Sequence, residues 1–216
     1  MLTVHTLASG SEGNCLLLSG GSVHLLVDAG ISARRITASL RSLGLSPCDV
    51  AAVLLTHEHT DHTAGLATLT KQYRLPLYAS DGTAAALSLR CPALRDVLRP
   101  IPRRCEFALG DVTVTVFPTS HDAAGSVDYR FDRLGASVGV LTDTGFVTDE
   151  AEQALRGVGL MVLEATTTWS GFCPARTPTT SSSASRAAAA TCPTMMLPPS
   201  PAVWRRAARA ALFWPT

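Results

Sequence analysis

The sequence predicts an α/β protein built in layers, with helices covering β-sheets. Short segments of alternating apolar residues follow one another near the N-terminus, as paired strands do. Strand-like and helix-like segments then alternate through the rest of residues 1–165. Polar clusters at 57–62, 121 and 143 each come just after a predicted strand. Because ligands usually gather at such strand ends, we expect a functional site there.

The composition favours a globular protein with an ample core. The chain has 216 residues, 46% of them hydrophobic and 16% charged, enough for one sizeable domain. The formal net charge of +1 gives no overall argument for nucleic acid or an anionic membrane. No apolar run could cross a bilayer, and the N-terminus does not have the pattern of a secretory signal. Six cysteines without a C-x-x-C pair favour reduced thiols, so we expect a cytoplasmic protein.

Periodicity and turn residues set the expected elements. Ser32 is expected to cap the first helix and Gly44 to end it, while prolines 92, 100 and 102 predict irregular connections. The predicted strands are 2–8, 15–18, 23–27, 50–55, 77–79, 112–117, 127–131, 137–141 and 160–163, and the predicted helices are 32–43, 63–73, 82–90 and 149–156.

The segment after the strand at 50–55 carries the chemistry. His57, His59, Asp61 and His62 fall within six consecutive residues, and imidazole with carboxylate is the donor set of zinc-type ions. In an extended segment His57 and His59 can point the same way, while Asp61 and His62 follow where a helix begins. The segment is not the helical H-E-x-x-H motif, because Asp61 stands where that motif needs its second histidine.

Two later residues extend this candidate site. A lone histidine such as His121 is more often structural, but the earlier cluster favours a ligand role that completes a three-histidine site. Asp143, in Asp-Thr-Gly, either makes a turn or bridges two ions, and we favour the bridge. His5 and His24 lie within predicted strands and are expected to pack.

The pattern His57-x-His59-x-Asp61-His62 resembles the signature of the metallo-β-lactamase fold. Asp28, in Val-Asp-Ala-Gly, is similar to that family's first motif, an acidic residue that supports the site. Residues 8–15, Ala-Ser-Gly-Ser-Glu-Gly-Asn-Cys, resemble the start of the YycJ-like hydrolases. The resemblance covers residues 1–165.

The resemblance implies an αββα sandwich with two divalent ions, usually zinc and sometimes manganese. His57, His59 and His121 would hold one ion. Asp61, His62 and a late histidine would hold the other, with Asp143 bridging. Metal-activated hydroxide would then attack the substrate, and Asp61 could take or orient a proton.

The YycJ-like branch implies phosphodiester hydrolysis of DNA, as a single-strand or 5′-to-3′ exonuclease. Nucleic acid is therefore the expected partner, and no membrane is expected. Ser11 and Asn14 would contact phosphate, although ordinary turn chemistry explains both equally well. The alternatives are a thioester or lactam hydrolase of the same fold, and an inactive truncated product.

The C-terminal part departs from the family. No histidine follows His121, so the second metal position is incomplete and the C-terminal half of the sandwich is truncated or scrambled. Residues 166–216 are low-complexity, rich in Thr, Ser, Ala and Pro. Restoring one base after the Ala165 codon permits strings that resemble the YycJ-like C-terminal half, such as Glu-Ala-Asn-His-Asp and Gly-His-Leu-Ser-Asn. Our hypothesis is out-of-frame translation, and a natural disordered tail is the alternative.

Overall fold

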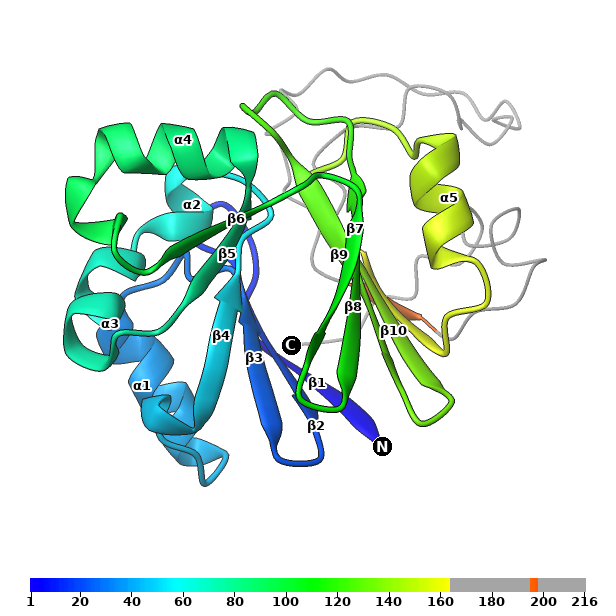
Figure 1. Cartoon of the computed structure of the whole chain (residues 1–216). Helices are drawn as coiled ribbons and strands as arrows, with labels where there is room; N and C mark the ends of the chain where they lie inside the picture. The colour runs from blue at the N-terminus through cyan, green and yellow to red at the C-terminus, as the bar shows by residue number, and fades with distance from the viewer. Residues whose placement is uncertain (164–194, 198–216) are drawn as a thin grey trace, which may run out of the picture.

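Two six-stranded sheets face each other, and helices cover their outer faces (Figure 1). The computed structural model describes residues 1–163 and 195–197. The four helices α1 to α4 lie outside the first sheet and α5 lies outside the second (Figure 1). This arrangement confirms the predicted αββα sandwich. No helix in the described ranges is long and apolar enough to cross a membrane.

The first sheet has the strand order β1-β2-β3-β4-β5-β6. Strands β1 to β3 pair antiparallel, and β3 to β6 pair parallel, with helices between them. The strands are β1 (Leu2–Ala8), β2 (Cys15–Gly20), β3 (Val23–Val27), β4 (Val50–Leu54), β5 (Leu77–Ser80) and β6 (Leu98–Ile101). The helices are α1 (Ala33–Ser42), α2 (Thr60–Thr63), α3 (Leu66–Tyr73) and α4 (Asp81–Arg90), with short 3₁₀ helices at Pro47–Asp49 and Pro92–Leu94. As predicted, the side chain of Ser32 caps α1.

The second sheet has the order β12-β11-β10-β9-β8-β7. Strands β7 to β10 form an antiparallel meander, and α5 (Asp149–Leu155) connects β10 to the parallel strand β11. The strands are β7 (Cys105–Leu109), β8 (Val112–Pro118), β9 (Val127–Arg133), β10 (Ala136–Leu141), β11 (Leu160–Leu163) and β12 (Met195–Leu197).

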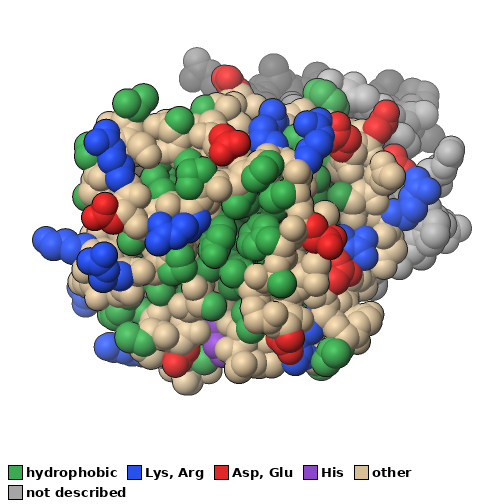
Figure 2. All heavy atoms as spheres, viewed as in Figure 1, with side chains coloured by type: hydrophobic (Ala, Val, Ile, Leu, Met, Phe, Trp, Pro, Cys, Tyr) green, Lys and Arg blue, Asp and Glu red, His purple; other side chains and the backbone are tan. Residues whose placement is uncertain are grey.

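The main core fills the space between the sheets. Leu18, Leu25 and Leu54 of the first sheet and Tyr129 and Phe131 of the second are all fully buried there. Burying each such side chain stabilises the fold by about 1.5–3 kcal/mol. On the face seen in Figure 2, hydrophobic side chains gather where the edge strands β6 and β7 meet. The layers are therefore held together by apolar packing that reaches this open edge.

The predicted helix over 63–73 is two helices. The first, α2, already begins at Thr60, and Gly65 separates it from α3. A Cβ at Gly65 would lie 2.2 Å from the carbonyl oxygen of Ile31, and the Gly65 amide donates to the Ala29 carbonyl at 2.8 Å. The chain bends here because only glycine permits this approach to the segment after β3.

The prediction of an irregular connection around Pro100 is wrong. Pro100 lies within β6, which is an edge strand, so the missing N–H costs no ladder hydrogen bond on the open side. The following strand, Cys105–Leu109, was not predicted, and its residues are only alternately half-buried. An edge strand with a weak apolar face gives a weak period-2 signal.

Most of the low-complexity segment predicted at 166–216 lies outside the described residues. Within it, the short strand β12 pairs antiparallel with β11. The boundary at Ala165 and the out-of-frame origin of the tail both stay predictions.

Candidate metal centre

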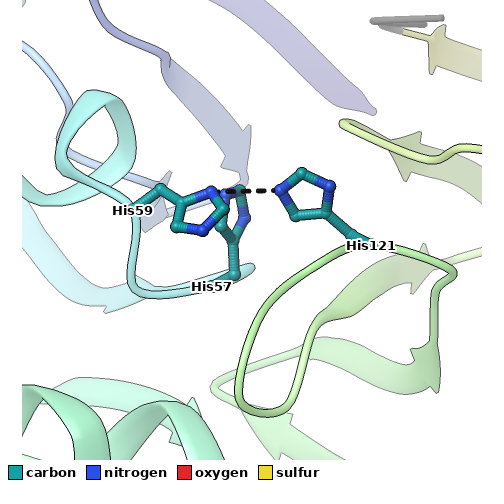
Figure 3. A group of neighbouring side chains, drawn as sticks. All are labelled: His57, His59 and His121. Carbon is teal, nitrogen blue, oxygen red and sulfur yellow. Dashed lines mark hydrogen bonds between the residues drawn. The ribbon is translucent and has the colours of Figure 1, made fainter.

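The candidate ligands come from both sheets and meet at one end of the sandwich. His57 follows β4, His121 follows β8 and Asp143 follows β10, each two or three residues past its strand. Figure 3 shows the rings of His57 and His59 on the segment after β4, facing His121 on the opposite loop. The structure thus brings together residues that lie more than 60 positions apart.

His57, His59 and His121 form a first group, with one donor atom from each lying within 4.8 Å of the others. The Nε2 of His121 is 3.1 Å from the Nδ1 of His59. His57 is buried, and its Nε2 has no hydrogen-bond partner among the residues that the structure describes. Burial, helped by the neighbouring charge of His62, lowers the pKa of His57 to about 2. A neutral imidazole with an unpartnered nitrogen fits a divalent ion of the zinc type.

His57, His62 and Asp143 form a second group within the same limit of 4.8 Å. The Nε2 of His62 lies 2.6 Å from an oxygen of Asp143. Burial lowers the pKa of His62, but the charges of Asp28 and Asp143 and their hydrogen bonds outweigh it and raise this pKa to about 11. The negative charges of Asp28 and Asp143 that favour a proton on His62 would also attract a cation, so this group also fits a divalent ion.

Asp28 belongs to neither ligand group but supports the histidines through hydrogen bonds. Its two oxygens accept hydrogen bonds from the amide and the hydroxyl of Thr56, both at 2.9 Å, and one oxygen is 2.8 Å from the Nδ1 of His62. The Thr56 hydroxyl is in turn 3.0 Å from the Nδ1 of His57. Because both Nδ1 atoms are engaged, only the Nε2 atoms can face an ion. The Nε2 of His57 has no partner among the described residues, whereas the Nε2 of His62 already contacts Asp143 and Asn14.

Asp61 lies at the rim of the site. Its carboxylate is 3.6 Å from the Nε2 of His62, and its side chain is 36% exposed. Its backbone is fixed from the other side: the Asp61 carbonyl accepts from the Asn14 amide at 2.7 Å, and a Cβ at Gly30 would lie 1.5 Å from this oxygen. Asp61 is therefore held beside the second group and reached by solvent.

The glycine-rich turn before β2 meets the site through Asn14. This side chain is buried, with its Nδ2 2.9 Å from the Nε2 of His62 and its Oδ1 accepting from the Gly10 amide at 2.9 Å. Ser11 is exposed in the same turn. The two residues thus occupy different positions, with only Asn14 directed at the ligands.

The other two histidines lie apart from these groups. His5 is exposed on the edge strand β1, so the prediction that it packs is wrong. His24 is half-buried on β3, with its Nδ1 2.8 Å from the Ser19 hydroxyl.

The sequence reasoning missed the residues that connect the loops. Ser120 accepts from Gly145 through its carbonyl at 2.8 Å and from Phe146 through its hydroxyl at 2.9 Å, which ties the His121 loop to the Asp143 loop. Asp128 is fully buried on β9 and accepts from the Thr142 amide at 2.7 Å. Burial raises the pKa of Asp128 well above its usual value. Asp128 alternates along β9 with the core residues Val127 and Tyr129, so it lies on the other face of the sheet, where a charged residue gives no sequence signal of burial.

A sequence model described as the Beta-lactamase superfamily domain matches residues 24–198. The chain belongs to this superfamily. It is 36% identical over 166 residues to "Exodeoxyribonuclease YycJ" of Bacillus anthracis, covering 73% of this chain and 60% of that protein. It is 35% identical over 164 residues to "Exodeoxyribonuclease WalJ" of Streptococcus pneumoniae serotype 2, covering 74% of this chain and 60% of that protein. The chain thus spans about 60% of the length of these curated relatives.

Solved structures show the same fold. Zn(2+)-bound PqqB from Methylobacterium extorquens superposes with a TM-score of 0.59 at 22% identity, covering 74% of this chain and 71% of that one. This likeness confirms the predicted fold, and the superfamily model and the curated relatives confirm the predicted family. Together with the two ligand groups, they support divalent metal binding.

Proposed function

We propose that this chain is a metal-dependent hydrolase that cleaves phosphodiester bonds of DNA, with exonuclease activity. The observation that carries the proposal is the pair of ligand groups that share His57 at the meeting point of the two sheets. The names of the YycJ and WalJ relatives favour DNA over other substrates of the fold. We further propose two ions of the zinc type, with manganese as the alternative, and a cytoplasmic location.

The two ligand groups would each hold one ion, and Asp61 would handle a proton. When bound, divalent ions supply Lewis-acid activation of water and of the phosphate. His57, His59 and His121 would hold one ion as neutral donors, while His62 and Asp143 would hold the other, with Asp143 reaching between them. Asp61 is exposed to solvent and lies 3.6 Å from the Nε2 of His62. It is therefore placed to take or orient a proton of the attacking water.

The glycine-rich turn would receive the substrate phosphate. Ser11 is exposed there and can donate its hydroxyl. Asn14 orders the turn through its bond from the Gly10 amide, and its Nδ2 lies 2.9 Å from the Nε2 of His62. Backbone amides and a hydroxyl in such a turn suit an anionic group.

The test is hydrolysis of single-stranded DNA by the purified full-length chain with added zinc or manganese. We expect nucleotide release that disappears in His57→Ala and falls on the order of 10²–10⁴-fold in Asp61→Asn, which keeps size but cannot take a proton. Exposed Glu106→Gln, on β7, is the matched control and should retain activity. Activity on thioester or lactam substrates without DNA cleavage would contradict the proposal.

A second candidate is an inactive truncated product. It is favoured by the absence of any histidine after His121 in the sequence, which leaves the second ion short of the late ligand that the family resemblance implies. Metal analysis separates the two: about two ions per chain would contradict the inactive reading, and none would contradict ours. Resequencing the gene around codon 165 tests the frame directly, and an activity gained on restoring the frame would locate the defect in the tail.

A further inference from the structure

Glu58 stands between two candidate ligands, His57 and His59, but belongs to neither ligand group. Its carboxylate is directed at other elements. Oε1 accepts a hydrogen bond from the Ala124 amide at 2.7 Å, and Oε2 accepts one from the Thr83 hydroxyl at 3.3 Å. The side chain therefore joins the end of β4, in the first sheet, to the loop that carries His121, in the second.

The loop from 119 to 126 rests on the start of α4. The Ser80 hydroxyl donates to the Gly125 carbonyl at 2.5 Å and accepts from the Thr83 amide at 3.2 Å. Gly82 lies so close that a Cβ there would be 2.2 Å from the Ala124 carbonyl oxygen. Glu58, Ser80 and Gly82 thus form one supporting surface under the loop.

His121 depends on this support more than His57 and His62 do. The Nδ1 atoms of His57 and His62 are held by Thr56 and Asp28. Within the described ranges, the only hydrogen-bonding partner of the His121 ring is His59, another candidate ligand. Histidine ligands normally hold their geometry through a further partner on the second ring nitrogen. His121 lacks one, so the backbone of its loop must set the position of its ring.

We propose that Glu58 is a positioning residue: its carboxylate fixes the 119–126 loop across the sheets so that His121 can share an ion with His57 and His59. The inference rests on the proposed metal site. It assigns Glu58 no contact with substrate and no proton transfer. The Glu58 bond to Ala124 joins the two sheets at the ligand end of the sandwich, as the Tyr129 hydroxyl bond to the Leu55 carbonyl joins them deeper down at 2.6 Å.

Zinc affinity of the full-length chain, measured by competition with a chelator, tests the proposal. Glu58→Ala removes both acceptors and should weaken binding on the order of 10–100-fold. Glu58→Gln should stay near wild type, since its carbonyl can accept from Ala124 and its amide can donate to the Thr83 hydroxyl. Thr83→Val, which removes only the weaker bond, should give a smaller loss. Glu106→Ala removes an exposed carboxylate that, within the described part of the chain, accepts from the Thr115 hydroxyl alone, so this variant should match wild type.

Amide hydrogen exchange of the metal-free protein gives a second readout. The Ala124 amide should exchange on the order of tenfold faster in Glu58→Ala than in wild type, and remain protected in Glu58→Gln. Unchanged zinc affinity and unchanged Ala124 exchange in Glu58→Ala would overturn the proposal. If wild type binds zinc without cleaving DNA, the proposed function fails while the positioning role stands. If wild type binds no zinc, the metal role of Glu58 fails too.

Discussion

The two sheets hold their parts of the metal centre in different ways. On the first sheet, His57 and His62 are buried over a network of Asp28 and Thr56, with contacts of 2.8–3.0 Å. On the second sheet, His121 is half-exposed and projects from a loop. One part is made rigid by its own buried hydrogen bonds. The other takes its position only when the sheets pack, through loop contacts such as those of Glu58. Variants in the first part should therefore lower mainly the unfolding free energy, and variants in the second should lower mainly the metal affinity.

Asp28→Ala should have the largest effect. It leaves the Thr56 amide and the Nδ1 of His62 buried without their acceptor, which costs about 3–5 kcal/mol of unfolding free energy by analogy with a broken buried ion pair. Urea denaturation of the metal-free chain measures it. Asp28→Asn, which keeps an acceptor and tolerates the positive φ of 60° at this position, should lose less. Equal losses in the two variants would contradict this account.

His121→Ala should separate metal binding from stability. The unfolding free energy should change by about 1 kcal/mol or less, because the ring is half-exposed. Zinc affinity should fall on the order of 100-fold, since a ligand and not merely its support is lost. Parallel denaturation and chelator titrations check both values. A large loss of stability would show that the second-sheet part is as rigid as the first.

The pH dependence of stability should distinguish the metal-free from the zinc-loaded protein. Because the pKa of His62 is raised from 6.5 to about 11, its stabilising contribution is fully present below pH 6.5 and is lost as pH rises toward 11. His62 alone should make the metal-free chain lose up to about 1.4 kcal/mol per pH unit between pH 6.5 and 8.5. This pH window stays below 9.0, the ordinary pKa of a cysteine thiol, so that cysteine ionisation does not dominate the measured slope. Zinc replaces the proton, so the loaded chain should show a smaller slope in the same denaturation series.

Ser120→Ala should have the smallest effect. It removes the hydroxyl bonds to the amide and carbonyl of Phe146, at 2.9 and 3.0 Å, so the loss should be about 1 kcal/mol or less for these exposed bonds. Zinc affinity should fall a few-fold, because the His121 and Asp143 loops then move apart more freely. Ser137→Ala removes a similar acceptor from the Gly159 amide, at 2.8 Å, and should leave zinc affinity unchanged.

The sequence predicted those site residues that are neighbours along the chain. His57 to His62 form a contiguous motif, so residue types and spacing were enough to indicate metal chemistry and the fold. Glu58, Ser120 and Asp128 act through partners 14 to 66 residues away, and no local pattern encodes those contacts. Strand β7 was missed for a related reason, since an edge strand with little burial has little pattern.

His57 sets a limit on how the centre can be filled. It belongs to both ligand groups, but with its Nδ1 beside the Thr56 hydroxyl it offers one free lone pair, on Nε2. One lone pair cannot serve two ions in full. The first zinc equivalent should take it together with His59 and His121, and the second should find a site with fewer donors. The binding isotherm should then show a tight step followed by a weak one, which makes occupancy depend on the free zinc concentration around the protein.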